Sequence, residues 1–165
     1  AASSTGKVTG TNPGTTNGEF NSNAVNKQIS KIEGAGKLNA TAARTVIKNG
    51  KYWKETINTS SFPYTKTVYI SSTNNTLVRV AVFWLKRNSL SSSDHTVLNV
   101  TQIGFSNLNV TVYAPDGTVM GTSATAYSNY EIVQFVPTQT GTYRIVISKA
   151  NTNASTKEYV GIAVW

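Results

Sequence analysis

Three runs that alternate between apolar and polar residues, each bounded by turn-forming residues, constrain this chain most strongly. The runs cover residues 108–113, 129–135 and 142–147. Pro115-Asp116-Gly117 closes the first run, and Pro137 and Gly141 separate the second run from the third. A period of two is typical of strands that bury one face, and Pro, Asp and Gly favour sharp reversals. This stretch therefore predicts consecutive strands of an antiparallel sheet.

The same β pattern continues over most of the chain from residue 52 onward. We expect strands over residues 64–70, 77–85, 97–103, 108–113, 131–135, 143–148 and 159–165. No helical pattern separates them, which excludes a parallel α/β fold. Short strands joined by turn-rich loops predict an all-β fold, a two-sheet antiparallel β-sandwich of jelly-roll type.

The most apolar of these strands, over residues 77–85, predicts where the core lies. Its apolar face carries Val78, Val80, Val82 and Trp84. Arg79 lies on the opposite face, which we assign to solvent. We expect Trp84 in the core, opposite a second sheet that supplies Val110, Val112, Ile145 and Ile147. Trp53, near the start of the β region, is expected to face a neighbouring domain or solvent.

One short helix is expected before the strands. Asn39 can cap a helix over residues 40–48, Lys48 favours its last turn, and Gly50 supplies a stop signal. Residues 5–30 are rich in Gly, Asn, Thr and Ser and contain the turn signal Asn12-Pro13-Gly14. That composition predicts a long loop ahead of the helix.

The composition is typical of a secreted β protein. The chain has no Cys, which excludes disulfides, a thiolate nucleophile and a Cys-ligated metal. Only 13% of the residues are charged, and Ser, Thr and Asn supply the polarity instead. No apolar run approaches the roughly 18 residues that a membrane-spanning helix requires. The sequence begins Ala1-Ala2-Ser3 without a Met or a signal-peptide core, so we expect a processed product or fragment that is extracellular.

The formal net charge of +8 raises the question of an anionic partner. Lys48, Lys51 and Lys54 form one small cluster, but the other Lys and Arg residues follow no stripe. No nucleic-acid-binding motif accompanies them. We therefore expect no specific nucleic-acid partner, and a general electrostatic attraction to anionic polymers.

Several motifs together resemble one known module. A strand that ends in Pro115-Asp116-Gly117, a strand that begins Asn129-Tyr130-Glu131 and a strand that begins Gly141-Thr142-Tyr143 are similar to segments of one β-sandwich. That sandwich lies C-terminal to the protease domain of many secreted subtilisin-like serine proteases. Gly34-Ala35-Gly36 and the Ala-rich residues up to Ala43 resemble the element that closes the catalytic domain of the same family.

The resemblance implies two parts and a role for each. Residues 1–50 would be the C-terminal loop and helix of a truncated catalytic domain, and residues 51–165 a β-sandwich accessory domain. It implies a non-catalytic domain of a secreted bacterial protease that stabilises the catalytic domain and assists substrate binding. Its implied partners are that upstream domain and a protein substrate. A carbohydrate-binding or cell-surface adhesion module remains the alternative, because both functions share the fold.

The chain offers no catalytic triad, so we expect no enzyme activity of its own and no catalytic or cofactor-binding residues. Gly121-Thr122-Ser123 resembles the nucleophile segment of the family, but it continues into an expected loop without the family's Pro. The only His, His95, follows Asp94 in a Ser-rich stretch and is assigned to a solvated loop. A base that is oriented by a carboxylate is therefore missing.

Calcium is the ion that the resemblance raises, because related sandwiches bind it through acidic residues. Where the family commonly has Asp-Leu-Asp-Leu, this chain has Asn107-Leu108-Asn109-Val110. Neutral amides bind a hard cation more weakly than carboxylates do, so we expect no tight metal site. We assign Asp116 to the turn and Glu131 to an ordinary strand position.

Aromatic side chains are a further source of binding, because they can form platforms for sugars. The candidate pairs are Tyr52-Trp53, Phe62 with Tyr64, and Tyr127 with Tyr130. Aromatic residues supply much of the buried area of a small sandwich, so core or inter-domain packing is the favoured role for all three pairs.

Overall fold

The computed structural model describes residues 40–73, 76–85, 87–94, 97–104, 106–125, 129–151 and 157–165. The elements in chain order are α1 (Ala40–Lys48), β1 (Tyr52–Asn58), the 3-10 turn η1 (Thr59–Ser61), β2 (Tyr64–Ile70), β3 (Val78–Trp84), β4 (Arg87–Asp94), β5 (Val97–Gly104), β6 (Asn107–Tyr113), β7 (Val119–Ser123), β8 (Tyr130–Phe135), β9 (Gly141–Asn151) and β10 (Lys157–Val164). The expected loop over residues 5–30, the Gly-Ala-Gly element, His95 and Tyr127 lie outside the described residues.

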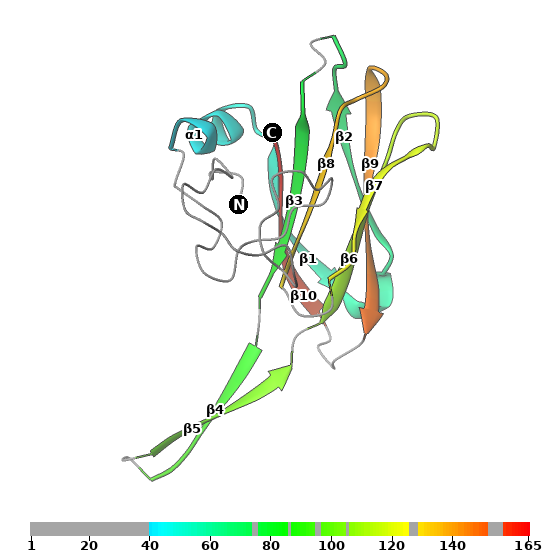
Figure 1. Ribbon diagram of the computed structural model, residues 1–165. Helices are drawn as coiled ribbons and strands as arrows, with labels where there is room; N and C mark the ends of the chain where they lie inside the picture. Colours follow the sequence, from blue (N-terminus) through cyan, green and yellow to red (C-terminus); the bar gives the residue numbers. More distant parts are fainter. Residues whose placement is uncertain are drawn as a thin grey trace, which may run out of the picture.

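Two four-stranded antiparallel sheets face each other (Figure 1). Their strand orders are β1-β10-β3-β8 and β2-β9-β6-β7. The pairs β1–β10, β2–β9, β3–β8 and β6–β7 are nested along the sequence, as in one long hairpin that is rolled over two sheets. That nesting is a jelly roll, so the predicted fold class is confirmed.

The core lies between the sheets and is built from every second residue of the strands. Burial along β6 alternates residue by residue, as its sequence predicts. Trp84 is completely enclosed on β3 and packs in a single core cluster. The other residues expected there are enclosed as well: Val80, Val82, Val110, Val112, Ile145 and Ile147. The predicted facing of these strands is confirmed.

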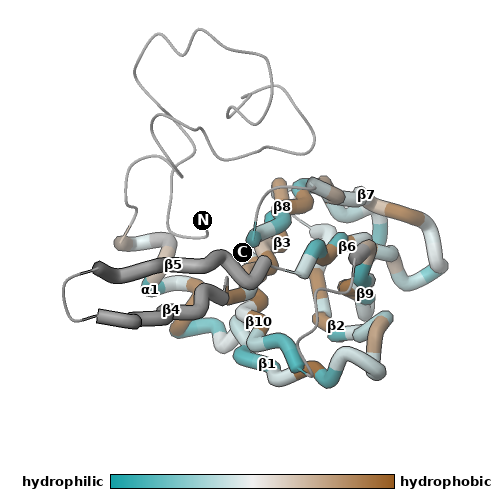
Figure 2. The backbone as a smooth tube through the Cα atoms, turned by 90° about the horizontal axis from the view of Figure 1, so that it is seen from below, coloured by the Kyte–Doolittle hydropathy of each residue, from teal (hydrophilic) through white to brown (hydrophobic). Residues whose placement is uncertain are grey.

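The helix α1 has the bounds that the sequence predicts, Ala40–Lys48. Beyond its end, the Asn49 N–H donates to the Thr45 carbonyl at 2.9 Å and the Gly50 N–H to the Ile47 carbonyl at 3.1 Å. Gly50 has a φ of 64°, a conformation that favours glycine, which explains why the helix stops there. Figure 2 shows α1 beyond the outer face of the β1-β10-β3-β8 sheet.

Three strands were not expected from the sequence, and one expected strand belongs to a different sheet than predicted. β1, β4 and β7 were read as connecting segments. Residues 97–103 do form a strand, β5, but it pairs with β4 in a separate two-stranded sheet. This hairpin extends away from the lower end of the sandwich in Figure 1. The placement of residues 97–103 in the sandwich was therefore wrong.

Polar contacts connect the two sheets at both pairs of outer strands. At the β1–β2 edge, the Lys66 ammonium lies 2.7 Å from the Glu55 carboxylate and 5.1 Å from the centre of the Trp53 ring. At the β7–β8 edge, Glu131 accepts hydrogen bonds from Ser123 and Thr125. Each edge of the sandwich is thus closed by a carboxylate that points inward.

The described residues contain no helix that is both long and apolar enough to cross a membrane.

Candidate functional site

The outer face of the β1-β10-β3-β8 sheet carries exposed aromatic side chains. Lys54 on β1, Gly161 on β10 and Phe83 on β3 are successive cross-strand neighbours, so they form one row across the sheet. Tyr52 on β1 and Tyr159 on β10 lie two residues from this row and on the same face. The exposed fractions are 52% for Tyr52, 48% for Phe83 and 42% for Tyr159. We call these five residues the outer aromatic face.

Gly161, at the centre of this face, has no side chain that projects from the sheet. A Cβ atom added at Gly161 would meet only the Phe83 carbonyl oxygen, at 3.9 Å, so no side chain of the described residues comes within 4 Å of that position. Two further small residues, Ala163 and Ala81, are paired on the neighbouring row. The rings therefore border a strip of half-buried small residues, Gly161, Ala163 and Ala81.

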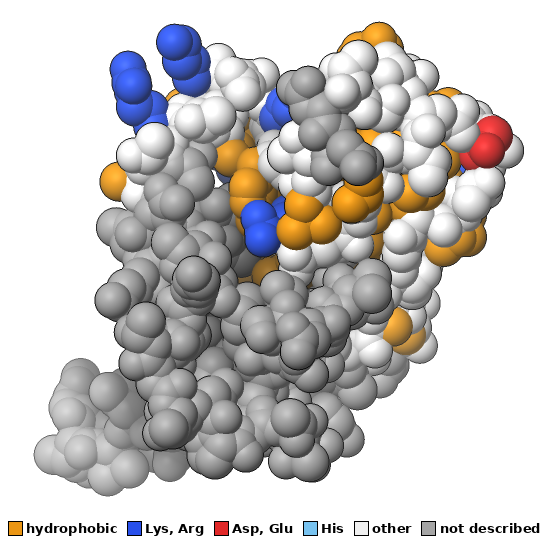
Figure 3. All heavy atoms as spheres, turned by 45° about the horizontal axis from the view of Figure 1, so that its top comes forward, with side chains coloured by type: hydrophobic (Ala, Val, Ile, Leu, Met, Phe, Trp, Pro, Cys, Tyr) orange, Lys and Arg blue, Asp and Glu red, His pale blue; other side chains and the backbone are white. Residues whose placement is uncertain are grey.

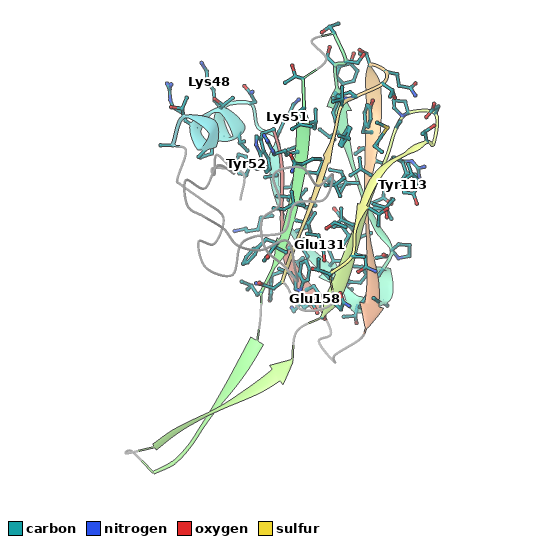
Figure 4. All side chains as sticks on the ribbon, viewed as in Figure 1. Lys48, Lys51, Tyr52, Tyr113, Glu131 and Glu158 are labelled. Carbon is teal, nitrogen blue, oxygen red and sulfur yellow. The ribbon has the colours of Figure 1, made fainter. Side chains whose placement is uncertain are left out.

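Positive charge gathers on the same side of the molecule. Lys54 is exposed within the face, and Arg44 and Lys48 are exposed on α1. Figure 3 shows Lys and Arg side chains together at the corner formed by α1, whereas an acidic side chain lies at the far edge of that view. Lys48 and Lys51 of the predicted lysine cluster lie at the α1 end, with Tyr52 close by (Figure 4).

The carboxylates of the described residues do not neutralise this charge. Glu131 and Glu158 are about 1–2% exposed and lie between the sheets (Figure 4). Glu55 is paired with Lys66 at the β1–β2 edge, and Asp116 lies in the turn between β6 and β7. Among the described side chains, no carboxylate faces the outer aromatic face.

Glu131 is not the ordinary strand carboxylate that the sequence suggested. It pairs with the buried Val82 across β8 and β3, which places its side chain on the inner face of the sheet. The Ser123 hydroxyl donates to Glu131 Oε2, and the Thr125 N–H and hydroxyl both donate to Oε1 at 2.6 Å. Burial raises the pKa of Glu131, and these hydrogen bonds oppose that shift.

The sequence predicted Ser123 in a loop, and that prediction was wrong. Ser123 is the last residue of β7. It is buried, and its hydroxyl is bonded to Glu131. The buried carboxylate thus holds this hydroxyl in place between the two sheets. Asp94 also lies in a strand, β4, although a loop was expected there.

A second buried carboxylate, Glu158, anchors the base of the β4–β5 hairpin. The Ser106 hydroxyl donates to Glu158 Oε1, and the Ser106 carbonyl accepts a 2.7 Å hydrogen bond from Trp84 Nε1. Trp84 and Ser106 flank the hairpin in sequence, so their contact brings its two ends together. This arrangement could not be predicted from the sequence, because the hydrogen-bonded partners are 22 and 52 residues apart along the chain.

The expected turn role of Asp116 is confirmed. Its Oδ1 accepts a 2.9 Å hydrogen bond from the Thr118 N–H, which lowers the pKa of the carboxyl group. The Gly117 N–H donates to the Ala114 carbonyl at 3.0 Å, and Gly117 has a φ of 91°. This φ value is the reason that glycine stands at the position.

The residues considered for calcium are not brought together. Asn107 and Asn109 lie two residues apart on β6, both half-buried, whereas Asp116 follows the other end of that strand. Glu131 points into the sandwich, away from all three. The Asn107 Oδ1 atom is buried and accepts no hydrogen bond from the described residues. The expectation of no tight calcium site stays a prediction.

The aromatic candidates separate into packed and exposed residues. Trp53, Phe62 and Tyr64 are half-buried against the core, so Trp53 does not simply face solvent or a neighbouring domain as expected. Tyr52 is exposed, and Tyr130 is half-buried at the end of the Lys54 row. Sequence reasoning missed Phe83 and Tyr159, although Phe83 alternates with Trp84 and had to face outward once Trp84 was placed in the core.

Comparison with known proteins finds no relative that would help to interpret this site. Neither a scan of protein-family models nor a search of curated proteins finds a match to the chain.

Proposed function

We propose that this chain is a non-catalytic C-terminal accessory domain of a secreted subtilisin-like serine protease. Residues 51–165 are the accessory β-sandwich, and residues 1–50 are the last loop and helix of the catalytic domain. The sandwich stabilises the catalytic domain and helps to bind substrate. The parent protein is a serine endopeptidase that acts outside the cell.

The burial of Ser123 carries the non-catalytic part of this proposal. Its Gly-Thr-Ser segment is the closest match in the chain to a protease nucleophile, yet its hydroxyl donates to Glu131 within the sandwich. A nucleophile needs open access to substrate, and a buried hydroxyl that donates to a buried carboxylate lacks that access. The polar groups of this segment hold two sheets together instead.

The path of the chain supports a neighbouring upstream domain. α1 ends at Lys48, and only Asn49, Gly50 and Lys51 separate it from β1 at the edge of the first sheet. α1 itself lies beyond the outer face of this sheet (Figure 2). A domain attached by so short a connection stays close to the sandwich, which suits a stabilising role.

Two measurements test the proposal. A fluorophosphonate probe and casein, incubated with the chain, should give neither labelling of Ser123 nor peptide hydrolysis. The coding sequence upstream of Ala1 should encode a Gly-Thr-Ser-x-Ala-x-Pro segment. Labelling of Ser123 would contradict the non-catalytic assignment, and an upstream sequence without that segment would contradict the protease assignment.

A carbohydrate-binding or cell-surface adhesion module is the second candidate function. The observation in its favour is the outer aromatic face, with three rings exposed by roughly half on one side of a sheet. Exposed rings on the outer side of a sheet can contact a ligand.

A further inference from the structure

We propose that the outer aromatic face binds an acidic polysaccharide, a polymer of sugar rings that carry carboxylates. This inference specifies the ligand of the second candidate function and rests on it. It does not depend on a connection with a protease. The argument combines the placement of three rings, the ammonium group among them and the absence of any described carboxylate side chain from this face.

The rings of Tyr52, Phe83 and Tyr159 lie on three sides of the small residues around Gly161. Neighbouring strands lie about 4.8 Å apart, so Lys54 on β1 and Phe83 on β3 are separated by roughly 10 Å with Gly161 between them. Tyr159 lies two residues, or about 7 Å, along β10 from Gly161. The apolar C–H faces of sugar rings suit such rings, because aromatic faces carry negative charge density. An extended polymer can lie over Gly161 and contact more than one ring.

Lys54 determines the charge of the ligand. Its exposed ammonium group lies directly across from Gly161, between Tyr52 and the rings on β10 and β3. A neutral polymer would leave this charge without a partner, whereas a carboxylate on the sugar ring can pair with it while both remain partly hydrated. Arg44 and Lys48 on α1 extend the positive potential beyond the face.

The same lysine argues against a protein partner at the centre of this face. Protein interfaces are depleted in Lys at their buried centres, because an enclosed ammonium group needs a complete set of partners. A nucleic acid would also stack on rings, but it follows a continuous basic groove. Lys157, two residues from Tyr159 on β10, and Arg79 on β3 also lie on the outer side of this sheet. Together with Lys54 these cations stand on three different strands, so a polymer with spaced carboxylates fits better than one with a phosphate at every unit.

Titration calorimetry with the full chain tests the inference. The probe is polygalacturonate, and its fully methyl-esterified form is the matched neutral polymer. Phe83→Ala and Tyr159→Ala should each weaken binding by about tenfold, as expected for central aromatic contacts. Lys54→Gln should weaken it by about threefold, and that loss should vanish with the esterified polymer. The control is Tyr69→Ala, because Tyr69 is 63% exposed on the other sheet and should leave binding unchanged.

Melting curves of all four variants should match the parent chain, because each altered side chain is exposed, and this keeps binding losses separate from unfolding. Equal binding of the esterified polymer would overturn the acidic ligand but leave a carbohydrate module standing. Stronger binding of an oligothymidylate than of oligogalacturonate would assign the face to nucleic acid and overturn the inference. Binding of neither sugar polymer would overturn both the inference and the second candidate function, while the accessory-domain proposal would be unaffected.

Discussion

Glu131 has two opposite effects on the stability of the core: its buried charge destabilises the fold, and its hydrogen bonds stabilise it. Its charge lies between the sheets, where burial favours the protonated form, yet three hydrogen bonds favour the carboxylate. The net effect is a raised pKa. The fold therefore binds a proton at Glu131 more tightly than the unfolded chain does.

The raised pKa makes the stability of the wild-type chain depend on pH. Protonated Glu131 adds to the free energy of unfolding. This stabilisation is fully present below the ordinary glutamate pKa of 4.5 and is lost as the pH rises through the higher pKa of the folded state. Glu131→Gln keeps an acceptor oxygen for the Thr125 donors, replaces the other oxygen by an NH2 group from which the Ser123 hydroxyl can accept after it rotates, and removes the charge. We expect this variant to melt a few degrees higher than wild type at pH 8, with a smaller difference at pH 4.

The matched control for that prediction is Glu131→Ala, which leaves the donors at Ser123 and Thr125 without their acceptor. It should lower the free energy of unfolding by about 1–3 kcal/mol, because buried polar groups lose their partner. Thermal melts at both pH values check the pair. A Glu131→Gln variant that melts lower than wild type at pH 8 would mean that the hydrogen bonds outweigh the burial of the charge.

Trp84 is the residue whose loss should damage the core most. It is the largest completely enclosed side chain, and its indole N–H donates to the Ser106 carbonyl. Trp84→Ala should cost about 3–5 kcal/mol and leave the chain unfolded or insoluble. Trp53→Ala should cost about 1 kcal/mol, because the half-buried ring of Trp53 loses only part of its contacts. If Trp84→Ala melts like the parent chain, the assigned facing of β3 is wrong.

The individual elements differ in how well they could be predicted from their sequences. α1 was predicted because its last turn and Gly50 carry local stop signals, and β6 because its burial alternates without exception. β4 was missed because its Ser-rich sequence has Leu90 as its only large apolar residue, and it gains a partner only from β5. β1 was missed because Glu55 occupies an inward position where an apolar residue is expected, and Lys66 compensates for it.

The candidate site was harder to predict than the fold. Phe83 and Tyr159 could each have been assigned to the outer face of its own strand from alternation alone, since both neighbour core residues in sequence. Their position beside Lys54 depends on the pairing of β10 with both β1 and β3. That register joins residues that are far apart in the sequence, such as Lys54 and Gly161, and a single sequence contains no signal for it. Glu131 was in phase with Val133 and Phe135, but its charge suggested solvent.

The β4–β5 hairpin is an element that the sandwich should be able to lose. It belongs to neither four-stranded sheet, and the contact between Trp84 and Ser106 holds its two ends together without it. Replacing residues 87–104 by a short Gly-Ser linker should leave a cooperative melt within a few degrees of the parent chain. Circular dichroism should retain the β signal. A loss of cooperative melting would show that the hairpin supports the sheets.

The whole molecule is a sandwich without disulfides that relies on packing and on its closed edges. The core is continuous from β1 to β10, and the Glu55–Lys66 and Glu131–Ser123 contacts connect the sheets on opposite sides. Since β1 pairs with the C-terminal strand β10, the sandwich is complete only when residues 52–164 are all present. The stable unit should therefore begin close to Tyr52.

Limited proteolysis with mass spectrometry tests this division of the chain, on which the accessory-domain proposal depends. If residues 1–50 belong to an upstream domain, they form few contacts with the sandwich and a protease should remove them first. The account predicts a resistant fragment that starts near Tyr52, ends at Trp165 and melts like the full chain. Equal resistance along the entire chain, or a fragment that unfolds once residues 1–50 are removed, would contradict it.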